Sequence, residues 1–111
     1  MDILIQRKGL RLKLPNKAFS VVVSEKLLFK VLSALLENAI TYAKENSTVE
    51  IGCDPLERTL WIGNQIGNEK YLFSSKIGEK ILKRLSHEIG FEYSIQQDEA
   101  YFRIELVFMS R

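Results

Sequence analysis

The chain has 111 residues, of which 46% are apolar and 27% charged, and its formal net charge is +2. This size and composition are typical of one globular domain with a single core, which we expect to span residues 1–111. The small net charge and the absence of a basic cluster argue against nucleic-acid binding. The single cysteine, Cys53, excludes an intramolecular disulfide and a cysteine-based zinc site.

The apolar runs are short and no signal peptide is evident. A membrane-spanning segment is therefore not expected. These patterns favour a cytoplasmic location without direct membrane contact, either for a free protein or for the cytoplasmic part of a membrane receptor.

The amino-terminal quarter of the chain is expected to form extended structure. Residues 1–7 are interpreted as a short extended lead-in. Leucines at 10, 12 and 14 alternate with charged residues, a pattern that is typical of a half-buried strand. After a turn at Pro15, the apolar and β-branched segment 19–23 indicates a buried strand. The two strands together predict a hairpin.

A long amphipathic helix is predicted for residues 27–43, where apolar side chains recur at helical spacing over a wide face. Ser24 is the expected N-cap, Glu25 suits the first turn, and residues 46–47 end the helix. The polar Asn38 is set into this apolar run. It has two interpretations, a helix residue bonded to a neighbouring loop or a ligand-binding residue.

The remaining elements are expected to be antiparallel strand pairs and one further helix. In chain order these are strands 49–53 and 59–63, a polar loop 64–68, a helix from about 74 to 89 ended by Gly90, and strands 91–96 and 101–108. The resulting order is β-β-α-β-β-α-β-β. It predicts an α+β fold of two layers, with helices on one face of a mixed, mostly antiparallel sheet.

Three segments resemble motifs of the catalytic, ATP-binding domain of bacterial sensor histidine kinases, whose Bergerat fold is shared with gyrase and a heat-shock chaperone. The segment LLFKVLSALLENAITYA (27–43) resembles the N-box. The segment TLWIGNQIGN (59–68) stands where the family has its first glycine box. The segment KIGEKILKRLSHEIGFEYSIQQ (76–97) resembles the second glycine box with its helix and following strand. The resemblance covers about residues 10–108.

The resemblance implies that ATP and Mg²⁺ are bound between the helices, outside the sheet. Asn38 matches the asparagine that holds Mg²⁺ on the phosphates, and an amide oxygen on a rigid helix suits this hard cation. Glu37 precedes it, as an acidic residue often does in the family. Thr41 stands where the family often has Lys or Arg, and Lys44 is an alternative cation one turn later. Tyr42 is a candidate for stacking on the base or for packing at the sheet edge.

The two glycine boxes supply the other candidate ligands. Asn64 stands at the position of an aspartate that accepts a hydrogen bond from the adenine amino group, and an amide oxygen can accept the same bond. The family's glycines are represented by Gly67 and Gly78. Lys76 is a candidate phosphate contact. Each of these residues also has a purely structural interpretation as a turn, helix-start or solvated residue. The lid between the boxes is reduced to about residues 69–73.

The implied function is that of a protein-histidine kinase. Such a domain binds Mg-ATP and donates the γ-phosphoryl group to a histidine on a separate dimerisation domain. The implied protein partners are that dimerisation domain and a response regulator. The alternative is a degenerate relative that binds little nucleotide and acts as a protein-interaction module in two-component signalling. Departures from the family pattern at Ala34, Asn64 and Glu79, together with the short lid, motivate this alternative. His87 is interpreted as a surface residue near a helix carboxyl end.

Overall fold

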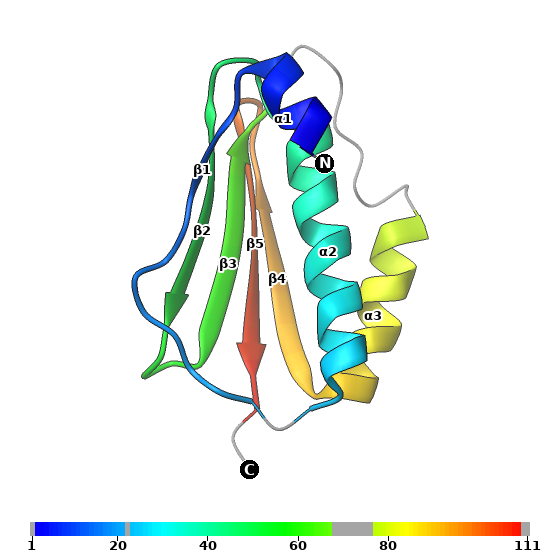
Figure 1. The fold of residues 1–111 in the computed structure, drawn as a ribbon. Helices are drawn as coiled ribbons and strands as arrows, with labels where there is room; N and C mark the ends of the chain where they lie inside the picture. Colours follow the sequence, from blue (N-terminus) through cyan, green and yellow to red (C-terminus); the bar gives the residue numbers. More distant parts are fainter. Residues whose placement is uncertain (1, 22, 68–76, 110–111) are drawn as a thin grey trace.

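The computed structural model describes residues 2–21, 23–67 and 77–109. Its elements in chain order are α1 (Asp2–Lys8), β1 (Arg11–Lys13), α2 (Glu25–Tyr42), β2 (Thr48–Asp54), β3 (Thr59–Gln65), α3 (Ile77–Ile89), β4 (Phe91–Gln97) and β5 (Tyr101–Phe108). The strands form one sheet of order β1-β2-β3-β5-β4, and α2 and α3 lie side by side over one of its faces (Figure 1). The predicted α+β fold of two layers is confirmed.

The core lies between the sheet and the helix pair. Strand β5 alternates along its length, so that every second side chain faces the helices. These are Phe102, Ile104, Leu106 and Phe108, each at most 5% exposed, as the sequence pattern predicted. From the helix layer, Leu82 and Leu85 of α3 are buried against this face.

Helix α2 follows its sequence signals closely at the start and less closely at the end. The hydroxyl of Ser24 accepts a hydrogen bond from the backbone N–H of Leu27 at 3.3 Å, which confirms the predicted N-cap. The helix ends at Tyr42, earlier than the predicted 46–47. Ala43 is extended and bridges to Ile66 after β3, so a pairing between distant segments stops the helix.

The amino-terminal predictions were wrong in part. Residues 2–8 form helix α1 in place of an extended lead-in. The three-residue β1 pairs in parallel with β2, so it is not part of a hairpin. In the described part of segment 19–23 there is no strand, and Phe19 packs against the core from an irregular segment. Leu12 is 39% exposed, because β1 is a short edge strand. Hydrophobic alternation indicates a strand but does not identify its partner.

The later elements agree with the sequence more closely. The β2–β3 and β4–β5 pairs are antiparallel, as predicted. Gly90 ends α3 with a φ of 92°, which suits the expected C-cap. Strand β3 continues to Gln65, so the predicted loop begins two residues too early. Among the described residues, no helix is both long and apolar enough to cross a membrane.

Candidate functional site

The carboxyl end of α2 and the end of β3 are joined by backbone hydrogen bonds. The N–H of Lys44 donates to the carbonyl of Gln65 at 2.9 Å, and the N–H of Gly67 donates to the carbonyl of Tyr42 at 3.2 Å. The second bond satisfies one of the carbonyls that the helix end leaves without a partner. It also brings Tyr42 from the N-box segment next to Gly67 from the first glycine segment.

A cavity of about 400 Å³ opens at this junction. Its described lining consists of Lys8, Thr41, Tyr42, Ala43, Lys44, Glu45 and Gly67. The volume falls in the range of small-molecule sites, roughly 300–1,000 Å³. Three predicted site residues, Thr41, Tyr42 and Gly67, therefore share one cavity.

Asn38 and Glu37 lie on α2 one turn before this lining. Successive helical residues are rotated by about 100°, so Asn38 lies within about 20° of the buried Val31 on the helix surface. Asn38 is accordingly half-buried, at the border of the apolar face, whereas Glu37 is exposed. The hydroxyl of Thr41 donates to the carbonyl of Glu37 at 2.8 Å. Thr41 therefore contributes a neutral side chain whose donor is already used within the helix.

Asn64 is buried in β3, on the face that the helices cover. Its side chain is 0% exposed, and its Nδ2 donates to the carbonyl of Gln65 at 3.0 Å. Its Oδ1 is also buried but has no donor in the described part of the chain. An unpaired buried acceptor costs about 1–3 kcal/mol, and a ligand amino group would remove that cost. This free acceptor fits the predicted role toward an adenine amino group. Asn64 is not itself part of the described cavity lining.

Lys8 of α1 is a cavity residue that the sequence did not indicate. Its Nζ donates to the carbonyl of Ile40 at 3.1 Å and to the carbonyl of Thr41 at 2.8 Å. A lysine is favourable there, because the last carbonyls of a helix are unpaired and carry partial negative charge. Lys8 is 32 residues away from Ile40, so no local pattern could have revealed the contact.

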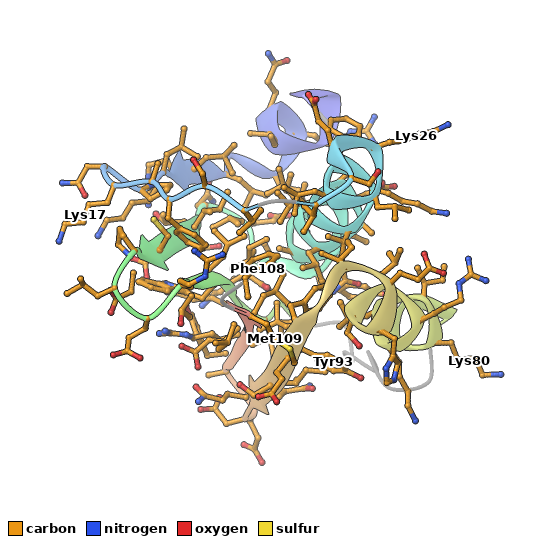
Figure 2. All side chains as sticks on the ribbon, turned by 90° about the horizontal axis from the view of Figure 1, so that it is seen from below. Lys17, Lys26, Lys80, Tyr93, Phe108 and Met109 are labelled. Carbon is orange, nitrogen blue, oxygen red and sulfur yellow. The ribbon has the colours of Figure 1, made fainter. Side chains whose placement is uncertain are left out.

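The second glycine segment is only partly described. Lys76 and the predicted short lid at 69–73 lie outside the described residues, and Gly78 lies in the first turn of α3. Lys80 is exposed and points away from the sheet and from α2 (Figure 2). His87 is exposed in the last turn of α3, as expected of a surface residue at a helix carboxyl end.

No family model matches the sequence, and a search of curated proteins gives no match. Solved structures do match the fold. The cytoplasmic segment of histidine kinase QseC aligns with a TM-score of 0.76 at 18% identity, over 99% of this chain and 68% of that one. The catalytic domain of histidine kinase ThkA aligns with a TM-score of 0.68 at 16% identity, over 96% and 84%.

Full-length ShkA in complex with AMPPNP aligns with a TM-score of 0.70 at 15% identity, over 100% of this chain and 28% of that one. The chain thus has the fold of histidine kinase catalytic domains. Identities this low establish the fold alone.

Proposed function

We propose that this chain is the nucleotide-binding catalytic domain of a sensor histidine kinase and that residues 1–111 form one such domain. In this proposal it binds Mg-ATP and donates the γ-phosphoryl group to a histidine on a separate dimerisation domain, for use by a response regulator. The observation that carries the proposal is the shared cavity of Thr41, Tyr42 and Gly67. The fold likeness supports it, as does the nucleotide analogue bound to ShkA.

Each predicted residue takes a role that its chemistry permits. Asn38 offers an amide oxygen for Mg²⁺ on the phosphates, and Glu37 adds negative charge beside it. Tyr42 supplies an aromatic wall for the base, and Asn64 supplies an acceptor for its amino group. Lys44 lines the cavity as a cation.

Gly78, in the first turn of α3, and the neighbouring Lys76 complete the proposed phosphate contacts. Backbone N–H groups at the start of a helix favour an anion. Bound Mg²⁺ would neutralise phosphate charge, and phosphoryl transfer depends mainly on such positioning and charge.

The first experiment is a calorimetric titration of the protein with ATP and ADP, with and without Mg²⁺. Nucleotide at 100 times its dissociation constant should raise the free energy of unfolding by about 2.7 kcal/mol. The melting temperature should rise accordingly. Absence of both heat and a melting shift at millimolar nucleotide would reject the proposal.

Asn38→Ala tests the proposed metal contact. The variant should lose about tenfold or more of its affinity for Mg-ATP, because a hydrogen bond or ligand bond to a charged group is removed. Its affinity without Mg²⁺ should change little. Asn16→Ala is the matched control, since Asn16 is exposed in the segment between β1 and α2. Equal losses with and without Mg²⁺ would contradict the assignment.

Asn64→Leu tests the proposed adenine acceptor with two readouts of opposite sign. Leucine has nearly the shape of asparagine and removes the unpaired Oδ1. It also removes the Nδ2 bond to the Gln65 carbonyl, but that carbonyl still accepts from Lys44, so the unliganded protein should be about as stable or more stable. The affinity for ATP should nevertheless fall, and the preference for ATP over GTP should weaken. An unchanged preference would show that Asn64 does not face the base.

The second candidate function is a protein-interaction module in two-component signalling that binds little nucleotide. The complete burial of Asn64 favours it, because a base must reach an atom that is closed to solvent. The same titration separates the two functions. A module of this second kind should bind its partner domain with an affinity that does not depend on ATP.

A further inference from the structure

The ammonium group of Lys8 lies on the wall of the cavity and has one N–H donor that is not used by the two helix carbonyls. An ammonium has three N–H donors, and two of them go to the carbonyls of Ile40 and Thr41. The third has no partner in the described part of the chain. Lys8 itself lines the cavity. We propose that Lys8 is a phosphate-binding residue of this chain, an inference that rests on the proposed nucleotide site.

A cation at this wall offsets the negative charge of the helix end. The carboxyl end of α2 carries partial negative charge and faces the cavity, where it would repel a phosphate. Glu45 in the lining adds a formal negative charge, and Thr41 adds none. Lys8 donates directly to these carbonyls and places a positive charge at this wall. Lys44 adds a second positive charge from the loop that follows the helix.

The backbone around Lys8 holds its position without using the side chain. The carbonyl of Lys8 accepts a hydrogen bond from the N–H of Asn46 at 2.8 Å, and the N–H of Arg11 donates to the carbonyl of Ser47 at 3.1 Å. Between them Gly9 has a φ of 65°, and a Cβ there would lie 2.5 Å from the Asn46 Oδ1. The positive φ at this crossing therefore favours glycine. A side chain that is already ordered loses less freedom when a ligand binds.

The alternative role for Lys8 is that of a helix cap alone. A cap stabilises α2 whether or not a ligand is present, and its loss affects all ligands of the cavity alike. A phosphate-binding lysine affects ligands in proportion to their phosphate charge. A series of ligands with one base and increasing phosphate number distinguishes the two roles.

The test is a calorimetric titration of adenosine, ADP and ATP, with Mg²⁺ present, into the wild-type protein and its Lys8→Met variant. The variant should bind ATP about tenfold more weakly, as expected for a lost charge-assisted hydrogen bond. Its affinity for ADP should fall by a smaller factor. Adenosine affinity should stay within about twofold of wild type. Lys8→Arg, which keeps the charge, should recover most of the ATP affinity.

Two further variants serve as controls. Lys17→Met makes the same change of charge at an exposed site near Cys53, at the opposite end of the sheet from the cavity, and should bind all three ligands normally. Lys8→Gln keeps a donor for the helix carbonyls without the charge. It should show the same loss of ATP affinity as Lys8→Met. It replaces Lys8→Met in the test if the melting curve shows that Lys8→Met does not fold.

The outcomes separate this inference from the proposed function. Equal losses for adenosine, ADP and ATP would reduce Lys8 to a structural cap. Unchanged ATP affinity in both Lys8→Met and Lys8→Gln would remove Lys8 from the site and leave the proposed function intact. A wild-type protein that binds neither ATP nor inorganic tripolyphosphate would overturn both.

Discussion

The two ends of α2 are stabilised in different ways. At the start, Ser24 bonds to Leu27 three residues later, within one local segment. At the end, the carbonyls of the last turn are bonded by Lys8, from a helix more than thirty residues earlier in the chain. The start of a helix can thus be encoded locally, whereas this helix end is completed by α1 and by the segment that follows β3.

The two ends of α2 also differ in the polarity of their surroundings. Near the start lies an apolar groove of about 210 Å³, whose described lining includes Phe19, Leu28 and Phe108. Phe108 is labelled in Figure 2, which views the molecule from this end. Near the end lies the larger cavity, with two lysines and Glu45. One helix therefore presents an apolar end and a charged end, and only the charged end suits an anionic ligand.

The largest expected effect comes from the core side chain at the charged end. Ile40 is 0% exposed, so Ile40→Ala should lower the free energy of unfolding by about 2–5 kcal/mol. Chemical denaturation measures the change. Phe29→Ala is the control at the other end, because Phe29 is 73% exposed and its loss should cost no more than about 0.5 kcal/mol. Comparable losses in the two variants would contradict the placement of the core.

A smaller effect is expected from the cap at the apolar end. Ser24→Ala should lower the free energy of unfolding by about 1 kcal/mol, because the N–H of Leu27 loses its acceptor. Ser24→Asn should retain most of the stability. Since the bond joins two neutral groups, the loss measured by denaturation should be the same at low and high salt.

The cap at the charged end should respond to salt. Lys8→Met should lower the free energy of unfolding by about 0.3–1 kcal/mol at low ionic strength, without any ligand. Screening should shrink this loss at 1 M salt, because Lys8 is only partly buried. Parallel denaturation of Ser24→Ala gives the salt-independent reference. A Lys8 effect that is insensitive to salt would mean that its contacts act by packing alone.

The smallest effect is expected from Tyr101, which pairs with Gln65 in the sheet beside the charged end. Burial raises the pKa of Tyr101 above its ordinary value of 10.0, with a further raising contribution from Glu50 and a lowering one from Arg103. The folded state therefore holds this proton more tightly than the unfolded state. Its contribution to stability is complete below pH 10 and is lost as the pH rises through the folded pKa.

Tyr101→Phe provides the measurement. Above pH 10, the free energy of unfolding measured by denaturation should fall less in the variant than in the wild-type protein. A variant whose stability follows the wild-type curve over this whole range would contradict the raised pKa.

Much of the fold could be predicted from the sequence because its signals are local. The alternation in β5 assigned Phe102 and Ile104 to the core face, and Gly90 marked the end of α3. Predictions of the fold failed where a strand had to be assigned a pairing partner. The leucines of β1 indicated a strand, but its parallel pairing with β2 and its exposure at the edge arise from contacts more than thirty residues apart.

In the candidate site, too, the features with local signals could be predicted and those set by distant contacts could not. The sequence alone determined that α2 is an amphipathic helix with Ser24 at its start and the polar Asn38 set into its apolar run. It also marked Tyr42 and Gly67 as candidates, because their residue types and order matched a family pattern. These properties depend on neighbours within a few turns or on a motif.

Only the tertiary structure decided what lies at the carboxyl end of α2. The pairing of Ala43 with Ile66 stopped the helix, and α1 delivered Lys8 to its last carbonyls. The burial of Asn64, with its unpaired Oδ1, likewise appeared only when the helices covered the sheet. The physical reason is that a helix end leaves backbone groups unpaired, and any distant segment that reaches them can satisfy them.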